Sequence, residues 1–102
     1  IEKDLTACKL AVAIGAERFV ILTDVPHVST GFATKSERRI GRMRASVARR
    51  LLAEGEFPPG SMRPKVEASA IFAEARRRSA LITNVEQLKS ALKDEAGTWI
   101  DP

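Results

Sequence analysis

The hydrophobic positions of the chain alternate between helical spacing and short continuous runs. Residues 3–16 carry Leu5, Cys8 and Val12 at intervals of three or four, which predicts an amphipathic helix. The hydrophobic residues 19–22 follow one another without interruption, which predicts a buried strand. A threonine and an aspartate come directly after this run, as expected at the carboxyl end of a parallel strand that helices cover.

The middle of the chain separates two further helical patterns from this strand. Residues 25–44 are rich in Ser, Thr, Gly and basic side chains and predict a loop, with one short extended piece at residues 39–42. Helical spacing returns in residues 45–54. It returns again around Pro64, whose fixed φ suits the first turn of a helix that we expect to reach about Arg78.

The last part of the chain predicts two more strands around a short helix. Residues 80–82 and 98–100 are short apolar runs, and Thr83 with Glu86 forms a T-x-x-E pattern typical of a helix N-terminus. Because helices alternate with short apolar strands, the expected fold class is α/β with a small, mostly parallel sheet of three or four strands. Ligands of such sheets bind beyond the carboxyl ends of the strands, where Asp24 and Thr83 would lie.

Composition narrows the class of protein. The chain has 102 residues, 44% of them hydrophobic and 29% charged, which is typical of one small globular domain. No apolar run is long enough to span a membrane, and no signal-peptide pattern is present. Cys8 is the only cysteine, so we expect it in the core of a protein from a reducing, cytoplasmic compartment. Because the chain begins at Ile1 and enters a helical pattern almost at once, we expect a piece of a longer polypeptide.

The basic charge of the chain makes an anionic partner worth considering. Seventeen Lys and Arg residues against thirteen Asp and Glu residues give a net charge of +4, and arginines cluster in residues 38–44, 49–50 and 76–78. A nucleic-acid-binding surface would interleave aromatic residues with such clusters, but no aromatic residue lies inside them. A solvated basic rim is therefore the favoured interpretation, and a nucleic-acid-binding module is the least favoured.

The most informative short segment is residues 60–65, GSMRPK. A Gly-Ser loop that runs into a helix presents backbone N–H groups and the positive end of the helix dipole, which together suit a phosphate. Lys65 works against that dipole unless an anion lies between them, and the alternative is a solvated lysine after a turn. Lys3 and Asp4 form a similar pair at the start of the first helix, where a structural role alone is favoured.

Two further polar positions follow the first strand. The side chains of Thr23 and Asp24 could bind a ribose or a metal ion, or could hydrogen-bond the backbone of a turn. Pro26, just after them, favours the role in a turn. His27 is the only histidine and has no Cys or carboxylate arrangement around it that predicts a metal site, so we assign it no chemistry.

Four segments together resemble carbamate kinases of the amino acid kinase family: E-K-D-L near the start, I-L-T-D-V after the first strand, G-S-M-x-P-K-V-E-A in residues 60–68, and A-G-T-x-I near the end. Their order and spacing also fit, and the third segment is the most specific. The resemblance implies a three-layer sandwich fold. It also implies an enzyme of arginine metabolism that exchanges a phosphoryl group between ATP and carbamate, with Mg²⁺.

The resemblance also implies roles for individual residues. Lys3 and Lys65 would flank the transferred phosphoryl group, and Asp4 would hold these two lysines in place. The residues expected around ADP or ATP are Thr23, Asp24, Val25, Gly60, Ser61, Met62 and Lys65. No residue is assigned to a metal ion.

Three features separate this chain from the family pattern. Glu2 stands where aspartate is usual, Arg63 replaces a small glycine, and residues 26–29 differ from the usual D-G-V-Y. We expect these differences to affect nucleotide affinity and turnover more than the fold.

Length adds a further expectation. Because carbamate kinases are about three times as long, the resemblance makes residues 1–102 the C-terminal nucleotide-binding portion. The N-terminal part, with the glycine-rich phosphate loop and the site for carbamate or carbamoyl phosphate, would be absent, and the isolated chain would not turn over. The full-length protein would be a homodimer without membrane contact. The alternative is a non-catalytic nucleotide-binding or interaction fragment with an exposed flank.

Overall fold

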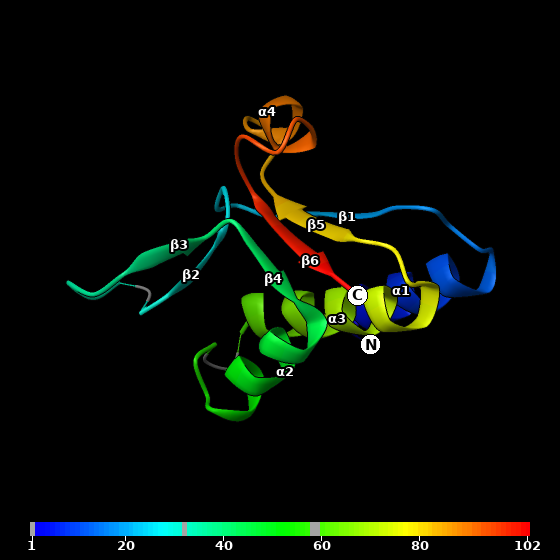
Figure 1. The fold of residues 1–102 in the computed structure, drawn as a ribbon, viewed down its shortest axis with the longest axis horizontal. Helices are drawn as coiled ribbons and strands as arrows, with labels where there is room; N and C mark the ends of the chain where they lie inside the picture. Colours follow the sequence, from blue (N-terminus) through cyan, green and yellow to red (C-terminus); the bar gives the residue numbers. More distant parts are fainter. Residues whose placement is uncertain (1, 32, 58–59) are drawn as a thin grey trace.

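A four-stranded sheet in the order β1-β5-β6-β4 organises the fold (Figure 1). The computed structural model describes residues 2–31, 33–57 and 60–102. Ile1, from which we expected a piece of a longer polypeptide, lies outside the described residues. The strands of the sheet are β1 (Phe19–Leu22), β4 (Arg42–Arg44), β5 (Ala80–Thr83) and β6 (Thr98–Asp101). β1 pairs with β5 and β4 with β6 in parallel, whereas β5 and β6 are antiparallel. The predicted α/β class with a mostly parallel sheet is confirmed.

Helices cover both faces of this sheet. They are α1 (Lys3–Ala13), α2 (Ala45–Ala53), α3 (Met62–Arg76) and α4 (Leu88–Leu92). In Figure 1, α1, α2 and α3 lie on one side of the sheet and α4 lies at its opposite side. Among the described residues, none of these helices has the length and hydrophobicity that a membrane crossing requires.

Two of the helices end earlier than the sequence predicts. α1 stops at Ala13, and Gly15 follows with a φ of 71°, which belongs to the left-handed region that glycine adopts readily. α3 ends at Arg76 rather than Arg78, because the backbone of Arg77 turns into the left-handed region with a φ of 57°. Helix ends depend on such single backbone turns, which hydrophobic spacing does not reveal.

The main core lies between the sheet and the three helices on its first face. The rings of Phe19 and Phe72 stack there with their centroids 5.2 Å apart. Cys8 is 1% exposed in the same cluster, which confirms its predicted place. Burial raises the pKa of the Cys8 thiol, so this side chain remains an uncharged core group. On the other face, Leu81 and Trp99 pack against α4.

The prediction of a loop for residues 25–44 is largely wrong. A hairpin of β2 (Val28–Thr30) and β3 (Arg38–Ile40) projects from the body of the molecule (Figure 1), and β4 follows directly. The extended piece expected at residues 39–42 overlaps β3 and β4. These strands have three residues each, which is too short for an alternating pattern to stand out.

The capping pattern predicted for Thr83 and Glu86 is also wrong. Thr83 is the last residue of β5, and its hydroxyl donates to the backbone carbonyl of Pro26. The side chain of Asn84 instead stabilises the turn before the helix, because its Oδ1 accepts the backbone N–H of Gln87 at 2.9 Å. The helix begins later, at Leu88, after the N-cap residue Gln87, which makes no side-chain capping hydrogen bond.

Candidate functional site

Contacts at both ends hold α1 against α3. Near the start of each helix, Nζ of Lys65 lies 3.0 Å from Oδ2 of Asp4. Near the other end, the guanidinium of Arg76 donates to the backbone carbonyls of Gly15 and Ala16, at 2.9 Å each. The two helices therefore run in the same direction, and their positively polarised N-termini lie at the same end of the pair.

Three of the predicted site residues meet at this end. Oδ1 of Asp4 lies 3.3 Å from Nζ of Lys3, and Oδ2 contacts Lys65. The side chains of Lys65 and Asp4 are 5% and 10% exposed, whereas that of Lys3 is 79% exposed. One buried carboxylate thus holds a buried and an exposed ammonium group. This contact also explains how Lys65 is tolerated near the positive end of the α3 dipole, because Asp4 supplies the opposite charge.

The start of α1 positions Asp4 in this cluster. The side chain of Glu2 accepts the backbone N–H of Asp4 at 2.7 Å, so Glu2 caps the helix. Both carboxylate oxygens of Asp4 are engaged by lysines, which suits a residue that organises cations better than one that binds a metal ion.

A pocket of 240 Å³ lies between the end of β1 and the start of α3. It is lined by four residues that the sequence assigned to a nucleotide: Asp24, Val25, Ser61 and Met62. The remaining three assigned residues do not line it. Thr23 extends the pairing of β1 with β5 through a backbone hydrogen bond to Thr83, Gly60 is exposed beside Ser61, and Lys65 is held in its ion pair.

Sequence reasoning missed four residues of the pocket, namely His27, Ser29, Glu56 and Phe57. Oε1 of Glu56 accepts the backbone N–H of Gly31 at 2.5 Å and so ties the pocket wall to the β2–β3 hairpin. Ser29 was missed because it lies in β2, a strand that the sequence did not predict. Glu56 and Phe57 could have been found from their position in the sequence, shortly before the GSM segment at residues 60–62.

The environment of His27 favours its neutral form. Burial lowers the pKa of the imidazole, and the nearby charge of Arg39 lowers it further, against the smaller opposite effect of Glu37. At neutral pH the ring therefore offers one donor and one acceptor nitrogen at the pocket wall.

The pocket combines apolar walls with a helix N-terminus. Val25, Phe57 and Met62 supply apolar surface, and Asp24 and Ser61 supply polar groups. Ser61, the N-cap residue of the 15-residue α3, makes no side-chain capping hydrogen bond. The first N–H groups of α3 are thus not occupied by a side-chain cap, which suits a ligand with an apolar ring at one end and an anionic group at the other.

Known proteins are similar to this chain in sequence and in architecture. The amino acid kinase family model matches residues 1–84. A carbamate kinase of Halobacterium salinarum is 43% identical over 102 residues, which are 100% of this chain and 33% of that protein. The carbamate kinase-like protein YqeA of Escherichia coli is 42% identical over 101 residues, which are 98% of this chain and 33% of that protein.

Solved structures agree with these relatives. Carbamate kinase from Giardia lamblia bound to AMP-PNP superposes with a TM-score of 0.92 at 32% identity, over 97% of this chain and 35% of that one. The Aeropyrum pernix K1 protein APE1968 has a TM-score of 0.87 at 42% identity, over 97% of this chain and 32% of that one. The chain therefore spans about a third of the length of the proteins it matches.

Proposed function

Because the chain belongs to the amino acid kinase family, we propose that it is the nucleotide-binding portion of a carbamate kinase-like phosphotransferase. The proposed reaction exchanges a phosphoryl group between ATP and carbamate, and in the ATP-forming direction it consumes carbamoyl phosphate and ADP. The 43% identity to a carbamate kinase over the whole chain favours this acceptor within the family. Its proposed setting is arginine metabolism in the cytoplasm.

The observation that carries this proposal is the cluster of Lys3, Asp4 and Lys65 at the paired N-termini of α1 and α3. Phosphoryl transfer asks a protein mainly to position its reactants and to neutralise charge on the equatorial oxygens of the moving group. Two ammonium groups and two helix N-termini supply positive charge without a proton-transfer step. In this proposal, Lys3 and Lys65 stabilise the phosphoryl group, and Asp4 fixes the distance between them.

The pocket beside α3 is the proposed nucleotide site. Its apolar walls suit the base, and Asp24 and Ser61 supply groups for the ribose and the phosphates. Val25 and Met62 line the pocket, and Gly60 lies next to Ser61 at the entry to the helix. AMP-PNP in the carbamate kinase from Giardia lamblia supports a nucleotide as the ligand of this architecture.

Magnesium fits this site as a companion of the nucleotide. In the described part of the chain, no group of three His, Cys, Asp or Glu side chains has the spacing of a metal site. Mg²⁺ in kinases is held largely by substrate phosphates with one or two carboxylates, and Asp24 is the exposed carboxylate at the pocket. When bound, the ion would neutralise phosphate charge.

Residues that bind carbamate or carbamoyl phosphate are proposed to lie outside these 102, in an N-terminal domain, and the complete protein is proposed to be a homodimer. The chain spans about a third of the related carbamate kinases, which favours a divided site. The alternative is a nucleotide-binding or interaction fragment without catalysis. Exposed apolar side chains on β1, Val20 at 36% and Leu22 at 45%, favour a partner of some kind for this flank.

Calorimetric titration of the chain with Mg-ADP tests the nucleotide site. We expect saturable binding that weakens at least about tenfold, or 1.4 kcal/mol, in Lys65→Met and in Lys3→Met. Lys3 is exposed, so its variant separates lost binding from lost folding, which circular dichroism monitors. Lys9→Met, an exposed lysine on α1, is the matched control and should bind as the unchanged chain does.

Either of two results would contradict the nucleotide site. One is folded protein that gives no binding heat at millimolar Mg-ADP. The other is unchanged affinity in both lysine variants. A coupled assay for ATP formation from carbamoyl phosphate tests the divided site, because the chain alone is expected to bind nucleotide without turnover. Turnover by the isolated chain would overturn the proposal of a divided site.

A further inference from the structure

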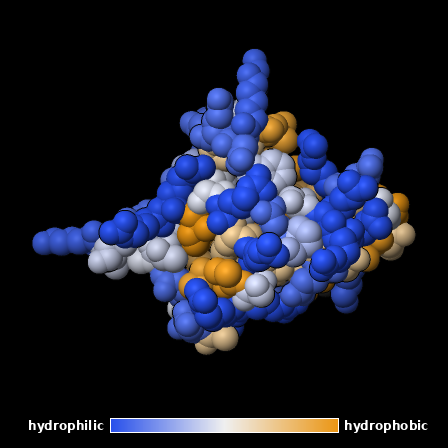
Figure 2. Space-filling model, viewed as in Figure 1, coloured by the Kyte–Doolittle hydropathy of each residue, from blue (hydrophilic) through white to orange (hydrophobic). Residues whose placement is uncertain are grey.

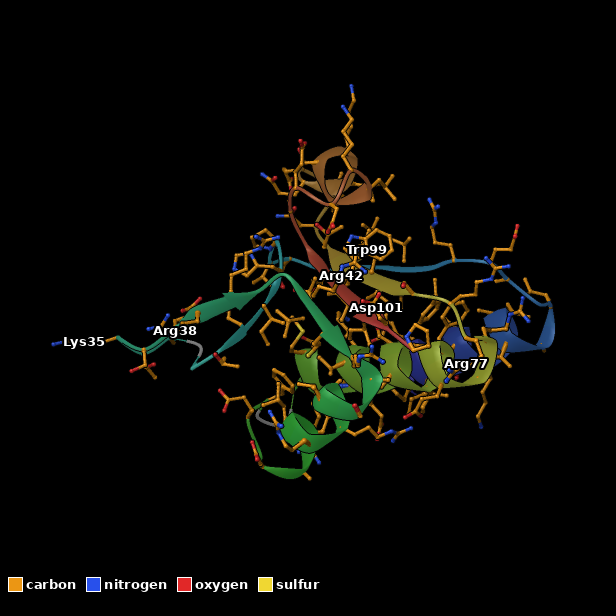
Figure 3. The ribbon with its side chains drawn as sticks, viewed as in Figure 1. Lys35, Arg38, Arg42, Arg77, Trp99 and Asp101 are labelled. Carbon is orange, nitrogen blue, oxygen red and sulfur yellow. The ribbon has the colours of Figure 1, made fainter. Side chains whose placement is uncertain are left out.

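A second depression lies at the opposite end of the sheet from the nucleotide pocket. It is located where β1 and β5 begin, whereas Asp24 follows the end of β1. Its volume is 370 Å³, and the lining residues that matter for its chemistry are Glu17, Arg18, Arg77, Arg78, Ser79 and Trp99. In Figure 3, Arg77 lies where α3 ends, and Trp99 lies on the adjacent sheet.

The charge of this depression is strongly positive. Three guanidinium groups face one side-chain carboxylate, that of Glu17, whose nearest oxygen is 3.8 Å from Arg78 and whose side chain is 80% exposed; Pro102, the last residue of the sequence, also lines the depression. Such an exposed and distant pair neutralises little charge. Within the described residues, Arg18 and Arg77 have no carboxylate at ion-pair distance. The cluster therefore keeps most of its positive charge available to an anion from solution.

The neighbouring carboxylate of Asp101 is already engaged elsewhere. Its Oδ1 accepts hydrogen bonds from Ser79 and from Arg42, at 2.6 Å each. Burial alone would raise the pKa of Asp101, but these two hydrogen bonds outweigh burial and lower it. Arg42 in turn stacks over the ring of Trp99 at 5.4 Å. Asp101 is thus an ionised partner of Arg42 and does not neutralise the arginines of the depression.

The backbone at Arg77 suggests that this side chain is there for a reason other than folding. With a φ of 57°, Arg77 occupies the left-handed position after a helix, where glycine is the usual residue and other residues are strained. The adjacent Arg76 has a structural task, since it binds the carbonyls of Gly15 and Ala16. That contact also holds the loop before Arg18 close to the end of α3.

We propose that this depression binds a multiply charged oxyanion, with a phosphate group as its natural ligand, through Arg18, Arg77 and Arg78. Planar guanidinium groups match the oxygens of phosphate in bidentate geometry. The arginines come from two loops, one before β1 and one before β5. Arg76 holds these loops together through its hydrogen bond to the carbonyl of Ala16. The site is distinct from the nucleotide pocket and does not depend on the function proposed there.

The chain carries its own reporter for this site, because Trp99 is its only tryptophan and lines the depression. Inorganic phosphate and glycerol 3-phosphate are titrated at constant ionic strength, set with potassium chloride, while tryptophan fluorescence is recorded. A saturable change is expected with phosphate and not with chloride or acetate. A response to phosphate alone would indicate the free ion as ligand, and a stronger response to the ester would indicate a phosphorylated metabolite.

Two variants and one control decide the outcome. Arg77→Gly and Arg18→Ser should each weaken phosphate binding about fivefold or more. Arg77→Gly should also keep or raise the melting temperature, because glycine suits the left-handed backbone. Arg50→Ser, an exposed arginine on α2, should bind as the unchanged chain does. The proposal is overturned by a non-saturable response, by equal responses to acetate and phosphate, or by unchanged affinity in both variants.

Discussion

At the scale of single residues, Lys65 shows how a cation is accommodated near a helix N-terminus. Its ammonium group is buried, so removal from water and the helix dipole both act against its charge. The carboxylate of Asp4, 61 positions earlier in the chain, compensates for both at 3.0 Å. From the dipole alone, the sequence left two alternatives for Lys65, a nearby anion or a solvated side chain, and only the family resemblance named Asp4 as the residue that holds it.

The substitution Asp4→Asn tests this compensation. Because the ammonium of Lys65 would be left buried without its partner, we expect a loss of about 3 kcal/mol in the free energy of unfolding. The substitution Lys3→Met removes the exposed partner of the same carboxylate and should leave the free energy nearly unchanged. Urea denaturation measures both. Equal effects of the two substitutions would contradict the assigned difference between the lysines.

His27 gives a prediction for pH. Its pKa is lowered in the folded chain, chiefly by burial, so the unfolded chain binds a proton at a higher pH than the folded one. Above the ordinary histidine pKa of about 6.5, His27 is neutral in both the folded and the unfolded chain, so its titration does not change the stability. As pH falls through that value, protonation favours the unfolded chain and stability is lost. His27→Gln should flatten this part of the stability profile between pH 7 and 5; an unchanged slope would contradict it.

At the scale of elements, the sequence predicted what depends on local spacing and missed what depends on distant contacts. The helices and the strands β1, β5 and β6 follow from periodicity and apolar runs. The β2–β3 hairpin depends instead on Thr98, whose hydroxyl accepts the N–H of Val28 and donates to the carbonyl of Ile40. A contact between residues 28 and 98 cannot be predicted from the hydrophobic spacing around either residue.

Thr98→Val tests this anchoring of the hairpin. Loss of the hydroxyl leaves the buried N–H of Val28 unpaired, and we expect a cost of about 2 kcal/mol. Hydrogen exchange at Val28 should accelerate correspondingly. The control is Thr30→Val in β2, because the hydroxyl of Thr30 makes no side-chain hydrogen bond to the other residues that the structure describes. Equal exchange rates in the two variants would show that the hairpin holds without Thr98.

At the scale of the whole molecule, the surface contains both charged and apolar regions. The face in Figure 2 is mainly hydrophilic, with small hydrophobic areas between long charged side chains. Among the residues that the structure describes, the exposed large apolar ones are Leu10, Ile14, Val20, Leu22, Val85 and Leu92. β1 lies at the edge of the sheet, so two of these residues belong to a strand with one described neighbour. The sequence predicted an exposed flank from chain length but not which strand would form it.

This edge predicts weak association of the isolated chain. An exposed edge strand with apolar side chains favours pairing with another chain. Sedimentation velocity at rising protein concentration should show reversible self-association. The double substitution Val20→Thr and Leu22→Thr, which keeps strand propensity, should reduce it. Ser90→Ala on α4 serves as a distant control, and equal sedimentation of all three proteins would exclude the β1 edge as the cause.

The candidate site was predictable only in part. Asp24, Val25, Ser61 and Met62 line the pocket because they belong to motifs that lie at a strand end and a helix start. The structure also places Lys3, Asp4 and Lys65 in one cluster, and their roles in phosphoryl transfer are the proposal made above. His27 and Glu56 enter the pocket through the shape of the hairpin and of the loop after α2, which the sequence does not encode locally.

The decisive measurement locates nucleotide binding on the chain, residue by residue. Backbone amide chemical shifts of the isotopically labelled chain are recorded while Mg-ADP is added. We expect the largest changes at Asp24, Val25, Ser61 and Met62, together with a response of the side-chain ammonium of Lys65. Changes concentrated elsewhere, with these residues unaffected at saturation, would contradict a nucleotide site between β1 and α3.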